Sequence, residues 1–322
     1  MLKKLGTTVG GYSIGVPEAG LYQLGSLSNV IDAEVIGDVR EAGVLQDFFQ
    51  SFKPEIAVHF AAQPLVLDSY IYPEETFTTN VVGTLNFLRQ VSDSDSCRLA
   101  LVITTDKVYK PKNTEVPHIE SDQLGGDDPY SASKAMADLL SQSWANLESG
   151  KKILIARAGN VIGAFDSSKN RLIPDINRAI RSAKPIEIRN PLSVRPWQHV
   201  LDCLGGYLSF ISHASVGSVP RILNFGPNHN DFHTVQEVVE IAKAMFPELE
   251  IMGPSKIYDK ENSFLALDSS AANQTLGWKN LIGFEESVRM SLGMPNVDPV
   301  EIAKRQIEDY LSKNSDLELV SR

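Results

Sequence analysis

The sequence predicts an α/β fold, a doubly wound and mainly parallel sheet with helices on both faces, followed by a smaller mixed lobe. Two observations support this. Through the first half of the 322 residues, short apolar runs alternate with amphipathic stretches of helical length, the pattern of repeated strand–helix–strand units. After Arg157 the alternation loosens, although no linker rich in Gly, Ser or Pro separates the two halves.

Residues 55–60, 99–104 and 152–157 are apolar runs of strand length, typical of buried parallel strands. Residues 39–52, 80–91 and 130–147 are predicted to be helices. Because ligands bind beyond the carboxyl ends of strands in such sheets, we searched for functional residues directly after each strand.

The second half is predicted to combine a smaller lobe with the last strands of the main sheet. We therefore expect a main domain over residues 1–160 and an interleaved lobe over residues 161–322. The elements expected in the lobe are helices at 171–182, 200–213, 234–245, 269–276, 284–292 and 299–311, and strands at 185–189 and 221–226.

Composition narrows the function classes. The net charge is −10 with both signs interspersed, which disfavours a nucleic-acid surface. Cys97 and Cys203 lie in no metal-ligand spacing, so neither a disulfide scaffold nor a metal site is expected. No apolar run is long enough to cross a bilayer, and the first residues lack the apolar core of a signal peptide. We expect a soluble cytoplasmic protein.

The strongest spacing is Tyr130 followed four residues later by Lys134, just after Pro129. Proline suits a first helical turn, so both side chains would share one helical face. An ammonium beside a phenol lowers the phenol's pKa, which suits a base that takes an alcohol proton during hydride transfer. The alternative is a solvent-facing pair, since this spacing occurs by chance in many helices.

A second group, Thr105, Asp106 and Lys107, ends the strand predicted at 99–104. A hydroxyl, a carboxyl and an amine in succession could supply a hydrogen-bond donor, a general acid and a general base. An ordinary polar turn in which Asp106 caps the following segment is the alternative.

A third group places Arg189 and Arg195 around a proline-containing loop. Arginine grips a pyrophosphate with planar, bidentate donors, and we favour this role for Arg195. In the alternative interpretation the arginines are surface charges and Trp197 is a core anchor.

Five further residues are weaker candidates. His59 lies inside an apolar strand and is expected in the core. Asn80 is most simply an N-cap, with cofactor contact as the alternative. Asn160 follows the strand at 152–157 and could donate to a phosphate. Trp144 and Trp278 are expected to be packing residues.

Taken together, these segments resemble the extended short-chain dehydrogenase/reductase family, with its Rossmann-type fold, and within it the CDP-glucose 4,6-dehydratases. The Asp106-Lys107 pair and the run from Arg195 to Val200 are the pieces most specific to that subgroup. The resemblance covers nearly the whole chain and rests on residues 36–40, 59–64, 79–84, 104–107, 128–134, 157–163, 171–175, 195–200, 223–227, 265–268 and 276–278.

The resemblance implies an internal redox cycle on NAD that converts a nucleotide-diphosphate hexose into its 4-keto-6-deoxy derivative, a lyase reaction of deoxysugar biosynthesis. Tyr130 would take the 4-hydroxyl proton, Lys107 the carbon-5 proton, and Asp106 would protonate the leaving 6-hydroxyl. Thr105 would bind the 4-oxygen, and Lys134 the NAD ribose. The remaining implied contacts are Asp38, Val39, Ala61, Ala62, Asn80 and Thr104 for NAD, and Asn160, Arg171, Leu172 and Arg195 for the nucleotide sugar.

The chain departs from the family pattern at its start. The family begins with a strand, a Gly-rich turn and a helix that receives the dinucleotide pyrophosphate, and we find no such segment here. By resemblance, residues 1–6 match the end of the first helix and residues 7–13 the second strand. We therefore expect the central first strand to be absent, neighbouring strand edges to be unpaired, the chain to be destabilised, and NAD to be held weakly or not at all. A smaller departure from the family pattern lies at Gly163 to Asp166, in the segment expected to form the substrate loop.

Two alternatives remain open. One is a UDP-sugar 4,6-dehydratase or a 4-epimerase on the same scaffold, although an epimerase would not need Asp106 and Lys107. The other is a non-catalytic remnant that acts only as a partner subunit. The resemblance also implies a homodimer through a four-helix interface, here the helices predicted at 80–91 and 130–147.

Overall fold

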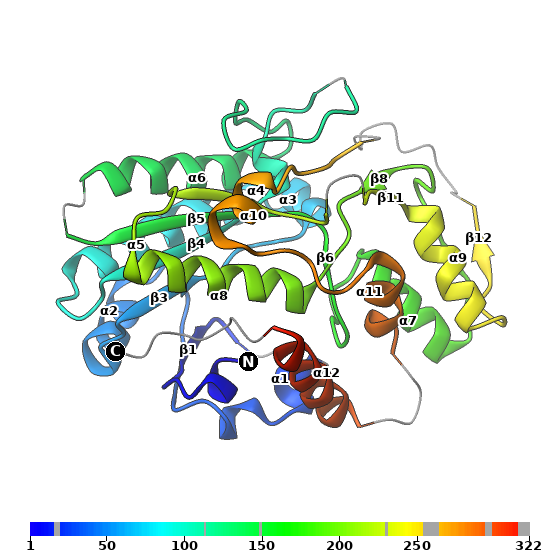
Figure 1. The fold of residues 1–322 in the computed structure, drawn as a ribbon, viewed down its shortest axis with the longest axis horizontal. Coiled ribbons are helices and arrows are strands. Elements are labelled where there is room, and N and C mark those ends of the chain that lie inside the picture. The colour runs from blue at the N-terminus through cyan, green and yellow to red at the C-terminus, as the bar shows by residue number, and fades with distance from the viewer. Residues whose placement is uncertain are drawn as a thin grey trace.

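The computed structural model describes residues 1–15, 20–112, 114–147, 150–228, 231–253, 264–293 and 298–314. Its centre is a four-stranded parallel sheet in the order β10-β5-β4-β3 (Figure 1). The strands are β3 (Ile56–His59), β4 (Leu99–Thr105), β5 (Lys152–Ala158) and β10 (Ile222–Phe225). The predicted strands are confirmed to within two residues at each end.

A separate two-stranded parallel sheet is formed by β1 (Gly10–Ser13) and β2 (Ala33–Ile36). In the doubly wound strand order 3-2-1-4-5-6, β2 and β1 take the places of strands 3 and 2, and β3 that of strand 4. Within the described residues, no strand is hydrogen-bonded between β1 and β3. The expected gap in the sheet and its unpaired edges are therefore present in the structure.

The main sheet is covered on both faces because its strands alternate their apolar side chains between two cores. Leu99 and Leu101 of β4 face one core together with α8 (Val200–Val216) and α10 (Ser270–Leu276). Ala100 and Val102 face the other, with α2 (Ala42–Phe52), α5 (Gly83–Asp93) and α6 (Pro129–Leu147). This arrangement confirms a Rossmann-like α/β fold.

The remaining part of the second half forms a smaller lobe with its own core around Trp197. Its helices are α7 (Leu172–Ser182), α9 (Val235–Met245) and α11 (Phe284–Ser291). A capping box, in which Thr234 and Glu237 bond each other's backbone, starts α9. The short strands are β6 (Val161–Ile162), β7 (Ile186–Glu187), β8 (Val194–Arg195), β9 (Gln198–His199), β11 (His233–Thr234) and β12 (Ile251–Met252).

Several elements are shorter than predicted or were not predicted. The strand expected at 185–189 is reduced to β7, and the helix expected from Asn80 begins as a π-helical turn, η3 (Thr78–Val82). The helices at 234–245 and 299–311 are confirmed as α9 and α12 (Pro299–Lys313). The short helices that the sequence did not reveal are α1 (Leu21–Leu24), η2 (Leu27–Asn29), α3 (Val66–Ile71), α4 (Pro73–Phe77) and η4 (Asp106–Val108).

The N-terminal segment packs against α8 and the C-terminal helix α12. Its first turn, η1 (Leu2–Leu5), contributes Met1 and Leu5 to a small core with Leu201 of α8 and Tyr310 of α12. The blue N-terminal segment and the red α12 accordingly lie next to each other below the main sheet in Figure 1. The first helix end and second strand expected in residues 1–13 thus correspond to η1 and β1.

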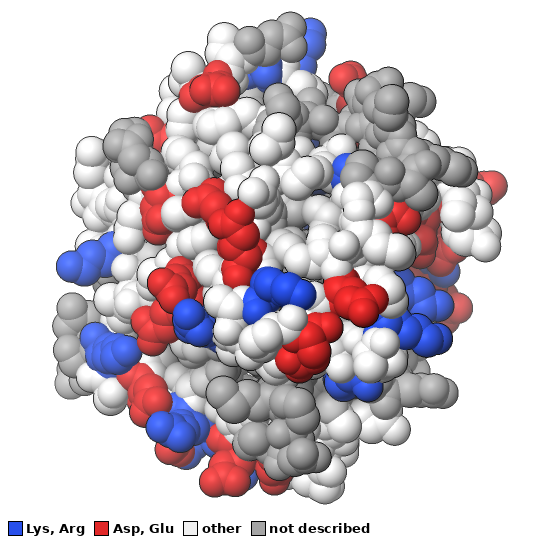
Figure 2. Space-filling view, turned by 90° about the vertical axis from the view of Figure 1, so that its right-hand side faces the viewer, with Lys and Arg blue, Asp and Glu red and all other residues white. Residues whose placement is uncertain are grey.

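The visible surface of the smaller lobe carries acidic and basic side chains side by side, not one extended basic stripe (Figure 2). This agrees with the interspersed charges of the sequence and with its net charge of −10. In the described part of the chain, no helix is both long and apolar enough to cross a membrane.

Candidate active site

The predicted functional residues gather where the carboxyl ends of β4 and β5 meet the first turns of α6. Thr105 ends β4, Asp106 and Lys107 form the short helix η4 directly after it, and Tyr130 and Lys134 lie in the first two turns of α6. The α6 helix packs against η4 and both strands. Residues separated by more than twenty positions are therefore brought together, as the sequence predicted.

Tyr130 is almost fully enclosed, with 9% of its surface exposed. Burial raises the pKa of its phenol, while a hydrogen bond with Thr105 and the charge of Arg171 act in the opposite direction. The expectation that Lys134 lowers this pKa is not met in the structure. The reason is that desolvation dominates, and the cation that acts on the phenol is Arg171, directly before α7.

The Lys134 ammonium is turned toward the sheet. Its Nζ donates to the backbone carbonyl of Ile103 at 2.8 Å, and only 8% of the residue is exposed. Burial lowers its pKa to about 8, whereas the carboxylate of Asp138, one helical turn further along α6, acts to raise it. Lys134 is thus a buried amine that changes its charge close to neutral pH.

Asp106 is the most enclosed acid of the group, with 2% of its surface exposed. Thr105 Oγ1 donates to Asp106 Oδ1 at 2.9 Å, but Oδ2 has no hydrogen-bond partner. Burial raises the pKa of this carboxyl, and the charge of Lys107 lowers it in part. A buried carboxyl with one unpaired oxygen and a raised pKa suits a proton donor, whereas the alternative of a polar turn would leave the carboxyl in water.

The second lobe supplies cations to this site. Arg195 of β8 is buried, and its charge acts on Asp106. Arg171 precedes α7, donates to the carbonyl of Pro64 at 3.3 Å, and acts on Tyr130. Leu172 packs against the core of the smaller lobe. Asn160 follows β5, and its carbonyl accepts from the backbone N–H of Gln198.

Of the residues expected along a dinucleotide, four lie after β2 and β3. Asp38 is held by both Nε and Nη2 of Arg40, which lowers the pKa of its carboxyl. Val39 is buried against Gly83 of α5. Ala61 and Ala62 are half-buried just beyond the end of β3. These residues lie in the loops that follow β2 and β3.

The side chains of Asn80 and Thr104 form hydrogen bonds inside the protein. Asn80 does not cap a helix, because it sits in the middle of η3. Its amide bonds the backbone of Gln63 and donates to Ser133 Oγ at 2.8 Å. Thr104 Oγ1 donates to Asp138 Oδ2 at 3.0 Å. Both side chains therefore tie α6 to neighbouring segments of the site.

The weaker candidates are packing residues. His59 stacks on Phe87 with ring centroids 4.7 Å apart, and burial lowers its pKa to about 3. Trp197 and Trp278 are buried in separate cores, while Trp144 is partly buried and donates to Ser92 Oγ. The core interpretation of His59 is confirmed, and Trp197 is the anchor that the alternative interpretation described.

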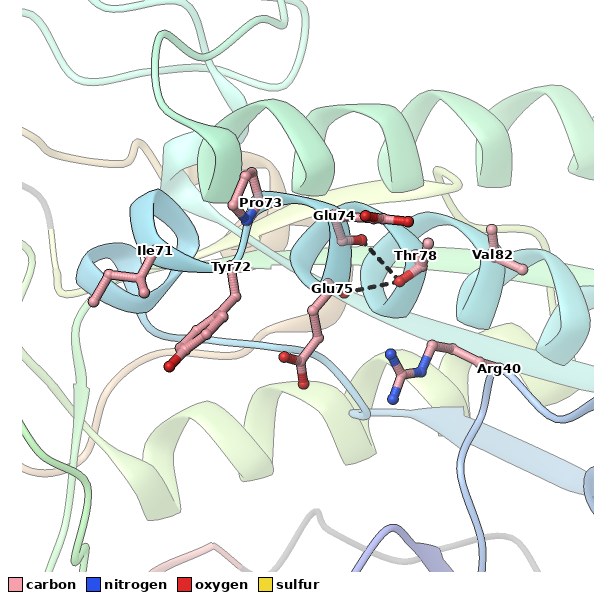
Figure 3. A pocket seen from close by; sticks show the side chains of 8 residues that line it. All are labelled: Arg40, Ile71, Tyr72, Pro73, Glu74, Glu75, Thr78 and Val82. Atoms are coloured by element: carbon pink, nitrogen blue, oxygen red, sulfur yellow. Dashed lines mark hydrogen bonds between the residues drawn. The ribbon is translucent and has the colours of Figure 1, made fainter.

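Two cavities flank the site without including Tyr130 or Lys134. The first, of about 740 Å³, lies between Arg40 and the segment from α3 to η3, and Figure 3 shows the Arg40 side chain directed toward Glu75. Its lining residues are Arg40, Ile71, Tyr72, Pro73, Glu74, Glu75, Thr78 and Val82. The second, of about 430 Å³, lies beside α7 and β7 and is lined by Arg178, Lys184 and Arg189 among others.

Sequence analysis missed Asp138 and Arg157, which form a buried ion pair beneath the site, with Nη2 2.8 Å from Oδ1. Their side chains are 0% and 1% exposed. The sequence did show that Arg157 is a charged residue inside an otherwise apolar strand. A charge buried in this way requires a buried partner of opposite charge. Nothing in the spacing identified which acid that partner would be.

Comparison with known proteins assigns the family. A sequence model described as "NAD dependent epimerase/dehydratase family" matches residues 19–226. The chain belongs to this NAD-dependent epimerase/dehydratase family. Within it, the chain is 35% identical to a CDP-glucose 4,6-dehydratase of Salmonella typhimurium, an alignment that covers 97% of this chain and 91% of the relative. A dTDP-glucose 4,6-dehydratase of Haemophilus influenzae is 26% identical over 79% of this chain and 80% of its own length.

Solved structures of the NAD-dependent epimerase/dehydratase family share the fold. A dTDP-glucose 4,6-dehydratase from Bacillus anthracis, solved with NAD, has a TM-score of 0.75 and 20% identity, and the match covers 96% of this chain and 92% of that one. A UDP-glucuronic acid 4-epimerase from Bacillus cereus, solved with NAD and UDP-glucuronic acid, has a TM-score of 0.76 and 15% identity, with 94% and 93% covered.

Proposed function

We propose that this chain is a nucleotide-sugar 4,6-dehydratase that converts a nucleotide-diphosphate hexose to the 4-keto-6-deoxy sugar, with CDP-glucose as the preferred substrate. The observation that carries the proposal is the buried Asp106 carboxyl, with its raised pKa and unpaired Oδ2, between Thr105 and Lys107 and close to Tyr130. The identity of 35% to a CDP-glucose 4,6-dehydratase over 97% of the chain supports the choice of nucleotide.

The residues near Tyr130 fit the nicotinamide and ribose of NAD, because Lys134 is a buried amine that donates to the Ile103 carbonyl and carries two further N–H donors. We place Asp38, Val39, Ala61, Ala62, Asn80 and Thr104 along the rest of the dinucleotide, and the cavity beside Arg40 adjoins them. The described residues contain no Gly-rich turn between a strand and a helix. Held there, NAD would supply reversible hydride chemistry for the oxidation at sugar carbon 4 and the reduction at carbon 6.

Tyr130 acts at the start of the reaction. Its phenolate takes the proton of the sugar 4-hydroxyl, and Thr105 donates a hydrogen bond to the same oxygen. Because burial raises the pKa of Tyr130, the phenolate needs stabilisation by a nearby cation, which Arg171 supplies from the position just before α7.

Lys107 and Asp106 carry the elimination of water. The 4-keto group acidifies the proton on carbon 5, and the Lys107 amine removes it; Lys107 returns a proton to carbon 5 when the hydride adds at carbon 6. Asp106 gives its proton to the departing 6-hydroxyl, for which its buried and partly unpaired carboxyl is suited. Asn160, Arg171, Leu172 and Arg195 hold the nucleotide diphosphate at the side of the smaller lobe.

A 4-epimerase is the second candidate, since proteins of that activity share the fold. Epimerisation at carbon 4 needs Tyr130 but neither an acid nor a base at carbons 6 and 5. The burial of Asp106 next to Lys107 therefore favours the dehydratase.

We also propose a cytoplasmic homodimer that pairs α5 and α6 with their copies in a second chain. These helices contact each other, and exposed apolar side chains lie on α6 and directly before α5, with 48% of Met136, 53% of Leu139 and 41% of Val82 exposed. Such a patch is typical of a protein–protein interface.

The experiment is incubation of the full chain and NAD with CDP-, UDP- or dTDP-glucose in turn. A 4-keto-6-deoxy product, detected by its absorbance in alkali, is expected to form fastest from CDP-glucose. If none of the three substrates gives a 4-keto-6-deoxy sugar, the proposal is contradicted. Formation of a 4-epimer without a keto sugar would favour the epimerase.

A further inference from the structure

Asp138 occupies a fully buried position one helical turn beyond Lys134 on α6, and none of its side chain is exposed. Four donors surround its carboxylate. Arg157 bonds both oxygens at 2.8 Å, Thr104 Oγ1 donates to Oδ2 at 3.0 Å, and Gln142 Nε2 donates to Oδ1 at 2.7 Å. A carboxylate with this many donors is fixed in place.

The partners of Asp138 form a row across the sheet. Thr104, Arg157 and Asn224 are neighbours in register on β4, β5 and β10. Arg157 continues the row through Nη1, which donates to Tyr109 Oη at 2.9 Å, and Tyr109 Oη donates to Asn224 Oδ1 at 2.6 Å. The Asp138 carboxylate is thus braced by three strands directly beneath Thr105 and Asp106.

The same carboxylate is the acidic neighbour of Lys134. The other titratable or charged groups around that ammonium are His59 on β3, which is neutral because burial lowers its pKa to about 3, and Arg157 on β5, which is paired with Asp138 itself. Asp106 on η4 is buried with a raised pKa, and Tyr130 precedes Lys134 by one turn. Asp138 therefore supplies the nearby negative charge that compensates for the burial of Lys134.

We propose that Asp138 is a positioning residue of the oxidation site: held by Arg157, it fixes Thr104 and keeps the Lys134 ammonium charged and in place beside Tyr130. The link to catalysis rests on the proposed function, whereas the link to Lys134 does not. Two measurements test the link to Lys134 and the link to catalysis separately. Both use Asp138→Asn, which removes the charge of the side chain but retains its shape.

The first measurement follows the nitrogen-15 signal of Lys134 Nζ against pH, assigned by its loss in Lys134→Met. In the wild-type chain the midpoint lies near pH 8, as burial predicts. In Asp138→Asn it moves to lower pH by about one unit or more. Gln142→Ala, which removes an uncharged partner of the same carboxylate, leaves it in place. An unchanged midpoint in Asp138→Asn would overturn the proposal whether or not the chain is a dehydratase.

The second measurement is the kinetics of keto-sugar formation. Asp138→Asn is expected to lower kcat on the order of tenfold to a hundredfold with an unchanged KM for the nucleotide sugar, which Asp138 does not contact. Asp138→Glu should restore part of kcat. A purely structural role would lower only the folded fraction, so unchanged kcat per folded molecule contradicts the proposal.

Asp138→Asn leaves Arg157 as an unpaired buried charge, which strongly destabilises proteins. If that variant does not fold, Asp138→Asn with Arg157→Met removes both charges and takes its place. The Lys134 midpoint should lie at lower pH than in Arg157→Met alone, which keeps the Asp138 charge, and equal midpoints in these two variants would refute the proposal.

Discussion

Gly159 faces Asp106 across the ends of β4 and β5 and leaves no room there for a side chain. A Cβ at position 159 would stand 3.3 Å from Asp106 Oδ2 and 2.3 Å from Pro196 Cγ. Pro196 joins β8 to β9 and so follows Arg195 directly. The absence of a side chain at Gly159 thus lets the smaller lobe close over the Asp106 carboxyl.

Gly159→Ala tests this contact. The added methyl overlaps a rigid proline ring, so Pro196 and Arg195 must shift away from Asp106. We expect a loss of stability of about 1–3 kcal/mol and a fall in kcat on the order of a hundredfold. Denaturant unfolding and keto-sugar assays measure the two effects. Gly150→Ala is the matched control because a Cβ there meets nothing within 4 Å; equal behaviour of both variants would contradict the contact.

Asp106→Asn should stabilise the chain while it removes activity. Burial raises the pKa of Asp106 above its usual value, so the folded state binds the proton more tightly than the unfolded state. The stability that this provides is complete at low pH and is lost as pH rises through the folded pKa. Thermal unfolding from pH 4 to pH 8 should show Tm values that are similar in acid and higher for Asp106→Asn at neutral pH. A lower Tm at every pH would count against a raised pKa.

Arg171→Leu should weaken the binding of the nucleotide sugar, because it removes a cation placed between α7 and the loop after β3. The KM is expected to rise about tenfold, as the loss of one charged hydrogen bond implies. Arg181→Leu, an exposed position in the last turn of the same helix, should leave KM unchanged. Steady-state kinetics measure the KM of both variants. An equal rise of KM in both would contradict a contact between Arg171 and the nucleotide sugar.

Leu139→Glu should dissociate the proposed dimer. Leu139 is 53% exposed on α6 beside Met136, and a charge placed in an apolar interface costs several kcal/mol. Sedimentation velocity should give a dimer for the wild-type chain and a monomer for the variant. Leu192→Glu, at a residue that is 75% exposed in the smaller lobe, is the control. A monomeric wild-type chain contradicts the α5–α6 interface.

The sequence predicted the main sheet well because β4 and β5 are long, almost wholly apolar runs. Parallel strands buried on both faces require that pattern. The candidate active site at the ends of β4 and β5 could be predicted because polar residues that follow such strands converge at one edge of the sheet. Thr105, Asp106 and Tyr130 are together for that reason.

Other features depend on tertiary contacts that spacing does not reveal. The raised pKa of Tyr130 comes from the depth of its burial. The pairing of Asp138 with Arg157 requires the packing of α6 on β5. Asn80 was predicted as a cap, but α4 and α5 join through η3 without a break, so position 80 is no helix start. Such π-helical turns have no simple sequence signal and often mark functional sites.

The most direct test of the dehydratase proposal is the fate of the carbon-5 proton. CDP-glucose is incubated with the full chain and NAD in deuterated water, and the sugar is examined by proton NMR. The proposal predicts a 4-keto-6-deoxy product that carries solvent deuterium at carbon 5. It predicts no such exchange with Lys107→Ala and normal exchange with Lys110→Ala, a control at the exposed Lys110 just beyond η4. Normal exchange at carbon 5 in Lys107→Ala, or a sugar changed only in its configuration at carbon 4, would contradict it.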